Sequence, residues 1–144
     1  MKITNEIKLT IDSKSINEGF SRAVIAAFAA LLDPTVEELS DIRTAVSEAV
    51  TNSIVHGYKE KMGKIYITAC STDNNTIRIK IRDKGVGIED IEKARQPLFT
   101  TLAGERAGLG FAVMESFMDK VRVRSAVGKG TTVTLEKTIA SKTR

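Results

Sequence analysis

The sequence has little of what would cross-link a protein or carry it into a membrane. It contains one cysteine, Cys70, in 144 residues, so no disulfide can form within the chain. The strand-like neighbours of Cys70 favour a buried thiol over a reactive one. The longest wholly apolar run, Ala23 to Leu32, is too short to cross a bilayer. The first residues lack the apolar core of a signal peptide. These absences predict a cytoplasmic protein without a membrane partner.

A strong excess of one charge is also missing. The net charge is +4, and the fractions of hydrophobic (42%) and charged (28%) residues are ordinary for a globular protein. The late basic residues are Lys120, Arg122, Arg124, Lys129, Lys137, Lys142 and Arg144. An anionic partner would explain them, but a solvated strand face and tail explain them more simply. No aromatic residues interleave with them as a single-strand binder requires, so we expect no direct contact with nucleic acid.

Two segments with the capping-box pattern mark the starts of helices in the first half of the chain. Ser15–Glu18 predicts a helix that runs to Leu32, where an Asp-Pro pair ends it. Thr35–Glu38 predicts a longer helix that stops at Gly57. A helix over residues 109–119 and a short one over 89–94 are expected later. The segment between them, up to Ala107, is expected to be irregular.

Alternating apolar residues predict the strands. They are expected around Ile7–Ile11, in a hairpin of Ile65–Ala69 and Ile77–Ile81, and around Val121–Val123 and Thr131–Leu135. No linker, repeat or low-complexity stretch interrupts the chain, so we expect one domain over residues 1–144. The order of elements predicts an α/β (α+β) two-layer sandwich with a mixed, mostly antiparallel sheet and helices on one face.

The second helix loses its charged side halfway along. Between Ala45 and Gly57 it carries one carboxylate, Glu48, and no lysine or arginine, which indicates cover on more than one side. Glu48, Asn52 and His56 are four apart and form one stripe. Either Asn52 offers an oxygen to Mg²⁺ while Glu48 deprotonates a hydroxyl near phosphates, or the stripe is a helix–helix hydrogen-bond network without a ligand. We expect His56 to have a structural role at the helix end.

Asp83 continues the inward side of the strand Ile77–Ile81, because side chains alternate with a period of two. Gly85 and Gly87 follow it. One interpretation is that this carboxylate accepts a hydrogen bond from an adenine amino group while the glycines let the backbone approach the ring. The other is an ordinary aspartate in a turn before glycine. The Asp-x-Gly-x-Gly pattern alone does not decide between them.

Further candidates for nucleotide contact lie later in the chain. Gly108, Leu109 and Gly110 open the last expected helix, whose free amides and dipole favour phosphate. The hydroxyl of Thr131 is expected to point inward with the apolar residues of its strand. The loop 96–107 is expected to close over nucleotide as a lid. This loop and its neighbours contribute Arg95, Thr100, Thr101 and Arg106. Walker A and Gly-x-Gly-x-x-Gly motifs are missing from the sequence.

The order and spacing of these motifs resemble the four boxes of the GHKL ATPase family, which holds ATP in a Bergerat-type fold. The matching motifs are Glu48-x-x-x-Asn52-x-x-x-His56, Asp83-x-Gly85-x-Gly87, Gly108-x-Gly110 and Gly130-Thr131. The resemblance implies that Glu48 is a catalytic base, Asn52 a Mg²⁺ ligand and Asp83 an adenine contact. The residues expected to contact ATP or ADP are Asn52, Asp83, Gly85, Gly87, Thr100, Thr101, Arg106, Gly108, Leu109, Gly110 and Thr131.

Within this family the chain resembles the anti-sigma serine kinases of sporulation. It is too short for the added domains of gyrase, Hsp90 and MutL relatives, and we expect no acceptor-histidine hairpin in it. The stretches that carry the resemblance are Leu32–Thr35, Ser47–Asn52, His56–Tyr58 and Ala94–Thr101. The resemblance implies a homodimer that inhibits a sigma factor of the sigma F type, contacts a partner through Arg22 and phosphorylates an anti-anti-sigma protein. A nucleotide-gated binding module without phosphoryl transfer, a general-stress anti-sigma kinase and an ADP-forming ATPase remain open alternatives.

The first helix independently suggests a protein interface. From Ala23 to Leu32 it is apolar all round, although a sheet covers only one side of a helix. Contact with a second copy, contact with a sigma factor, or burial as a connector helix would each account for this.

Overall fold

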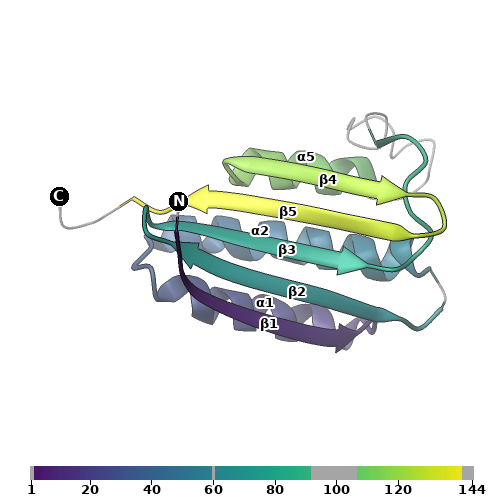
Figure 1. The fold of residues 1–144 in the computed structure, drawn as a ribbon, viewed down its shortest axis with the longest axis horizontal. Helices are drawn as coiled ribbons and strands as arrows, with labels where there is room; N and C mark the ends of the chain where they lie inside the picture. The colour runs from purple at the N-terminus through teal and green to yellow at the C-terminus, as the bar shows by residue number, and fades with distance from the viewer. Residues whose placement is uncertain (1, 60, 92–106, 141–144) are drawn as a thin grey trace.

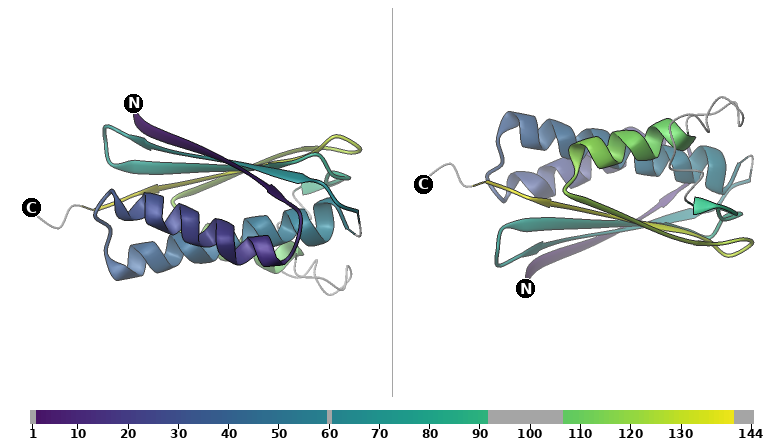
Figure 2. Two further views of the ribbon diagram at one scale, coloured as in Figure 1. Left: turned by 90° about the horizontal axis from the view of Figure 1, so that it is seen from below. Right: turned by 90° about the horizontal axis from the view of Figure 1, so that it is seen from above.

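The computed structural model describes residues 2–59, 61–91 and 107–140. Its elements in chain order are β1 (Ile3–Asp12), α1 (Ile16–Ala30), α2 (Val36–Asn52), the π-helix η1 (Ser53–Gly57), β2 (Lys64–Thr72), β3 (Thr76–Asp83), α5 (Ala107–Phe117), β4 (Lys120–Ala126) and β5 (Gly130–Thr138). The strands form one sheet in the order β1-β2-β3-β5-β4, and all four pairings of neighbouring strands are antiparallel. Helices α1, α2 and α5 cover one face of this sheet and leave the other open (Figures 1 and 2). The predicted two-layer α+β sandwich is confirmed.

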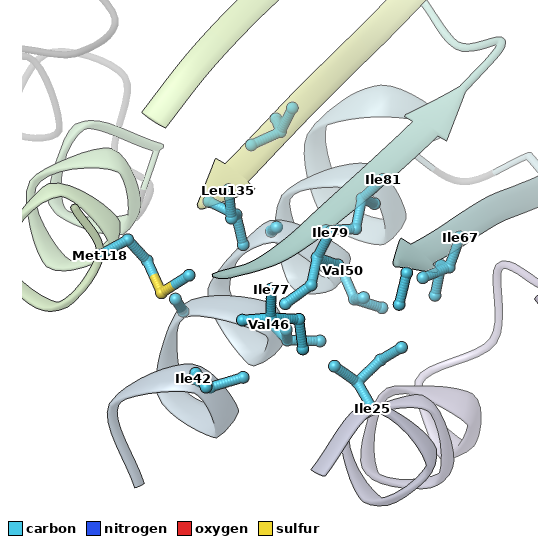
Figure 3. Packing of buried hydrophobic residues seen from close by; sticks show 14 of the residues in the cluster. Ile25, Ile42, Val46, Val50, Ile67, Ile77, Ile79, Ile81, Met118 and Leu135 are labelled. Carbon is cyan, nitrogen blue, oxygen red and sulfur yellow. The ribbon is translucent and has the colours of Figure 1, made fainter. Parts of the chain in front are cut away.

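The hydrophobic core lies between the sheet and the helices, and the central strand β3 supplies much of it. Ile77, Ile79 and Ile81 are buried and point toward Val46 and Val50 of α2 (Figure 3). Because side chains alternate along a strand, Asp83 at the end of β3 stands on the same covered side as these isoleucines. The carboxylate of Asp83 therefore lies at the edge of the hydrophobic core, where β3 ends.

Only one of the two predicted capping boxes forms. Thr35 Oγ1 accepts from the Glu38 amide at 3.0 Å, and a Glu38 carboxylate oxygen accepts from the Thr35 amide at 2.8 Å. The predicted box at Ser15 is wrong, because Ser15 already has helical backbone angles and its side chain makes no capping bond. A capping side chain reaches back to the helix only from an extended residue. The carboxylate of Glu18 instead lies 3.5 Å from a guanidinium nitrogen of Arg22.

The end of the second helix is a wide turn. The helix reaches Gly57 as predicted, but its last five residues form the π-helix η1, in which the Tyr58 amide donates to the Ser53 carbonyl at 3.0 Å. Such turns are common at functional sites. The extra residue in the turn shifts the direction of the following side chains around the helix axis. Here Asn52 and Ser53, although adjacent in sequence, both line the same pocket as Asp83.

Smaller boundary differences do not change the architecture. Helix α1 ends two residues before the predicted Leu32, and α5 begins and ends two residues earlier than predicted. Of the short helix expected at 89–94, Glu89 and Asp90 are not helical, Ile91 is, and residues 92–94 lie outside the described residues. Within the described ranges no helix is long and apolar enough to cross a membrane. Cys70 is buried, and burial raises the pKa of its thiol, as expected for an unreactive cysteine.

Candidate functional site

A pocket of about 290 Å³ opens where the C-terminal end of α2 and the turn η1 meet the ends of β3 and β5. Its polar lining includes Asn52, His56, Asp83 and Thr131, and its apolar lining includes Ala49, Val86, Ile88, Phe111 and Val133. Apolar walls with a few placed polar groups are typical of a site for a small organic ligand. The volume, near the lower end of the range for such sites, suits one flat ring system.

The carboxylate of Asp83 is fixed at this pocket by three donors. Its Oδ2 accepts from the Ser53 hydroxyl at 2.8 Å, and its Oδ1 accepts from the backbone amides of Gly85 at 2.9 Å and Thr131 at 3.3 Å. The side chain is buried, with 3% of its surface exposed. A carboxylate has about four acceptor positions, so these bonds leave one position open, on Oδ2. The site therefore holds a rigid acceptor with capacity for one further donor.

The glycines after Asp83 allow close contact between backbone segments. A Cβ atom on Gly85 would stand 2.1 Å from the Gly57 carbonyl oxygen, and one on Gly87 would stand 2.2 Å from the Ala126 carbonyl oxygen. Gly87 also has a φ of 80°, which residues with a side chain rarely adopt. The expectation that these glycines let the backbone approach a ring is therefore incomplete, because in the structure they first let three backbone segments approach one another.

Asn52 lies at the opposite wall, against the first turn of α5. A Cβ atom on Gly110 would meet the Asn52 side-chain amide at 3.1 Å, so a glycine at this position leaves the amide room. Asn52 Nδ2 is buried and has no hydrogen-bond partner in the described part of the chain. A buried polar atom without a partner is costly. The buried amide of Asn52 therefore keeps a donor that no described residue satisfies.

Glu48 does not line this pocket. It lies one helical turn before Asn52 and is buried, at 8% exposure, but it faces a second hollow of about 400 Å³ between α1 and α2. The other residues that line this hollow are Arg22, Ser40, Arg43, Thr44 and Ser47. Glu48 and Arg22 thus line the same hollow, whereas Asp83 lines the other pocket.

The other predicted site residues divide into three groups. Asn52, Asp83, Gly87 and Thr131 line one pocket, and His56 lines it too. Gly108 and Gly110 lie in the first turn of α5, as predicted for a helix start. Arg95, Thr100, Thr101 and Arg106 lie outside the described residues, as does the side chain of Leu109. The predicted lid over residues 96–107 is outside the described residues except at Ala107.

Two serines that sequence reasoning missed complete the site. Ser53 holds Asp83, and the Ser125 hydroxyl accepts from the Ile88 amide at 2.7 Å and contacts the Thr131 hydroxyl at 2.8 Å. Ser53 could have been found from the sequence. It lies beside Asn52 in the stretch of the helix that was expected to be covered, where a polar side chain needs a partner. Ser125 lies in β4, where side chains alternate between the two faces of the sheet, and no feature of the sequence distinguishes it.

No group of three or more histidine, cysteine, aspartate or glutamate side chains gathers as a metal cluster within the described ranges. A divalent ion at this pocket would take few protein ligands. Mg²⁺ often binds in this way, through one or two protein oxygens together with substrate phosphates and water. The oxygen of the Asn52 amide fits that requirement, because a half rotation of the amide exchanges it with the unpartnered Nδ2.

Known proteins are similar to this chain over most of its length. A family model described as a histidine kinase-like ATPase domain matches residues 17–137. A protein named anti-sigma F factor from Thermoanaerobacter sp. is 59% identical and aligns over 98% of this chain and 99% of its own length. A protein of the same name from Geobacillus kaustophilus is 53% identical, over 94% of each chain.

Two solved structures have the same fold. The RsbU and RsbW domains of a Mycobacterium tuberculosis protein match with a TM-score of 0.72 at 22% identity, over 98% of this chain and 34% of that one. A histidine kinase domain from Erythrobacter litoralis matches with a TM-score of 0.58 at 20% identity, over 85% of this chain and 61% of that one. At these identities the likeness concerns the fold.

Proposed function

The chain belongs to the histidine kinase-like ATPase family, and from that premise we propose that it is an anti-sigma factor and an ATP-dependent serine kinase. It binds and inhibits a sporulation sigma factor of the sigma F type, and it phosphorylates and so inactivates the anti-anti-sigma protein that opposes it. The names of the relatives at 59% and 53% identity support the sigma factor partner. We propose that it acts in the cytoplasm as a homodimer.

The observation that carries the nucleotide part of the proposal is the open acceptor position of Asp83. The 6-amino group of adenine is a donor, whereas guanine presents a carbonyl oxygen at that position. Oδ2 of Asp83 has room for one donor and is held in place by Ser53. A hydrogen bond to a charged group contributes about 1.5–3 kcal/mol, which corresponds to roughly ten- to hundredfold selectivity for ATP over GTP.

The phosphates and their metal are assigned to the other end of the pocket. Asn52 would hold Mg²⁺ through its side-chain oxygen, and bound Mg²⁺ neutralises charge on the phosphates. The free amides in the first turn of α5, which begins at Ala107, favour a phosphate group. Gly110 supports this assignment because it leaves the Asn52 amide room to turn.

The transfer step is assigned to the side of α2 that faces α1. An acceptor serine that enters the hollow of Glu48 and Arg22 would meet a carboxylate one helical turn from Asn52. Glu48 takes the proton of the serine hydroxyl, the serine oxygen forms a bond to the γ-phosphorus, the bond from that phosphorus to the β–γ bridging oxygen breaks, and ADP leaves. Arg22 lies where it can contact the acceptor protein.

The outer side of α1 supports a protein partner. Ile16, Phe20 and Leu31 are 80%, 56% and 72% exposed, and the exposed residues Ala23 and Ala27 continue the same helical face between them. An apolar stripe of this kind is typical of a surface covered by another protein. The sequence analysis expected such a surface only from Ala23 onward, and the stripe begins a full two turns earlier.

The test is phosphoryl transfer measured together with complex formation. The purified chain is incubated with Mg²⁺-ATP labelled at the γ-phosphate, an anti-anti-sigma protein and, separately, a sigma factor of the sigma F type. We expect label on a serine of the anti-anti-sigma protein and a stable complex with the sigma factor. Failure to label the acceptor and failure to capture the sigma factor would each contradict the corresponding half of the proposal.

A second function, a nucleotide-gated binding module without phosphoryl transfer, is favoured by one observation. Glu48 faces a different hollow from the one that Asn52 and Asp83 line. The same experiment separates the two functions, because the module would form nucleotide-dependent complexes and leave the acceptor unlabelled. Parallel capture with a general-stress sigma factor distinguishes the two anti-sigma branches.

A further inference from the structure

The open face of the sheet carries a hollow of about 880 Å³, on the side away from the helices. The basic residues that line it are Lys8, Arg78, Lys80, Arg82, Lys120, Arg122 and Arg124. Glu136 is the one acidic residue in the lining. This face is seen directly in Figure 1, across β3, β5 and β4.

The cations form two columns because of the strand register. Arg78, Lys80 and Arg82 alternate outward on β3, and Lys120, Arg122 and Arg124 alternate outward on β4. Strand β5 lies between these strands, and its pairings align the columns row by row: Lys80 and Arg122 both pair with Thr134, and Arg82 and Arg124 both pair with Thr132. The columns are therefore roughly 10 Å apart, with about 7 Å between cations along each one.

Little of this charge is neutralised within the protein. The ion pair of Arg78 with Glu136, at 3.0 Å, is the only one formed by residues lining the hollow in the described part of the chain. The guanidinium of Arg82 covers the ring of Tyr66 at 4.9 Å, which positions it without removing its charge. From sequence alone the late basic residues fit either a solvated face or, less simply, an anionic partner, and only the strand register shows that they align with those of β3.

We propose that this face binds an extended acidic segment of a partner protein. In an extended chain, side chains alternate left and right with about 7 Å between those on one side, which matches the spacing within each column. A segment laid over β5 would direct Asp or Glu side chains to β3 on one side and β4 on the other. The half-buried hydroxyls of Thr132 and Thr134 lie beneath it as donors for its backbone carbonyls.

The same observations disfavour other occupants. A second copy of this face would bring two basic surfaces together, which costs energy through repulsion. Single-stranded nucleic acid is bound on exposed aromatic rings, and Tyr66, the one aromatic residue in the lining, is already covered by Arg82 and lies 5.2 Å from the Lys84 ammonium. An acidic polypeptide would bind the two columns of cations and does not require exposed aromatic rings.

The experiment measures the fluorescence anisotropy of a fluorescein-labelled ten-residue glutamate peptide with the full chain at 50 and 200 mM salt. We expect binding that weakens as salt rises, because exposed charge pairs are screened. The double variant Arg122→Gln/Arg124→Gln is expected to bind the peptide roughly five- to thirtyfold more weakly. The matched control, Lys14→Gln/Lys61→Gln, removes the same charge from exposed positions outside the hollow and is expected to change affinity by less than about twofold.

Three results would overturn the proposal. They are no binding of the peptide by the unchanged protein at 50 mM salt, equal weakening in both double variants, and tighter binding of a ten-residue oligothymidylate or a short DNA duplex than of the peptide. Equal weakening would mean that only net charge matters. The pair Lys80→Gln/Arg82→Gln tests the other column if the first variant fails to fold, and Mg²⁺-ATP binding checks that each variant is intact.

Discussion

Two buried carboxylates on the helix-covered side of the sheet, Asp83 and Glu48, have different surroundings and different proposed roles. Asp83 accepts three hydrogen bonds from three separate segments, and its surroundings leave it one open acceptor position. Glu48 instead faces a hollow between α1 and α2 that also contains Arg22 and Arg43. Rigidity suits the proposed role of Asp83, which is to recognise adenine. The proposed role of Glu48, which is to accept a proton from a second protein, requires that its carboxylate remain accessible.

The largest effect is expected from Glu48→Gln. The amide keeps the shape of the side chain but cannot accept a proton, so phosphoryl transfer should fall by ~10²–10⁴-fold while ATP affinity stays within about twofold. Transfer of labelled phosphate and calorimetric titration measure the two quantities. Glu37→Gln, an exposed carboxylate on the same helix, is the control. Unchanged turnover in the Glu48 variant would remove this residue from the role of base.

Gly85→Ala tests whether the rigidity around Asp83 depends on backbone packing. The new methyl group would stand 2.1 Å from the Gly57 carbonyl oxygen, so the loop must move. We expect unfolding in urea to show a loss of about 1–3 kcal/mol and ATP affinity to fall with it. Gly19→Ala has its nearest neighbour, an Arg22 side-chain nitrogen, at 3.6 Å and lies within a helix, so it should be neutral or stabilising. Equal behaviour of the two variants would contradict the packing argument.

Ser53→Ala tests the single side chain that holds Asp83 Oδ2. Loss of this 2.8 Å hydrogen bond should weaken ATP binding by about fivefold, corresponding to ~1 kcal/mol, because the carboxylate gains freedom to turn. Ser116→Ala, which removes an exposed hydroxyl bonded to the Ala112 carbonyl, should leave ATP affinity unchanged. An unaltered affinity in the Ser53 variant would show that the two backbone amides suffice.

Much of the fold was predictable because local periodicity and burial agree. The isoleucines of β3 alternate, and that period alone placed Asp83 inward. The box at Thr35 and Glu38 forms as predicted because Thr35 has extended backbone angles, from which its hydroxyl reaches the Glu38 amide. The same pattern at Ser15 failed, since the turn before α1, closed by Asn17 donating to the Asp12 carbonyl at 3.0 Å, already gives Ser15 helical angles.

The site residues on strand β3 could be placed from the sequence, because the alternation of side chains fixes which face they occupy. For the residues on α2 the sequence could not show which neighbouring element each side chain meets. The stripe Glu48, Asn52 and His56 was expected to share one surface. Glu48 lines the hollow with Arg22 of α1, whereas Asn52 and His56 line the pocket at the end of β3, although the three residues are spaced four apart. Residue spacing on one helix cannot reveal which neighbour covers which side. The roles of Gly85 and Gly87 depend on contacts with Gly57 and Ala126, which are distant in sequence.

The measurement that tests the central claim most directly is a calorimetric comparison of Mg²⁺-ATP and Mg²⁺-GTP binding to the unchanged protein and to Asp83→Asn. If the open acceptor position of Asp83 reads the adenine amino group, ATP binds roughly ten- to hundredfold more tightly than GTP, and the ratio collapses in the variant. The ratio is informative even if the variant binds both nucleotides weakly. Equal affinities in the unchanged protein, or the same ratio in both proteins, would contradict the account.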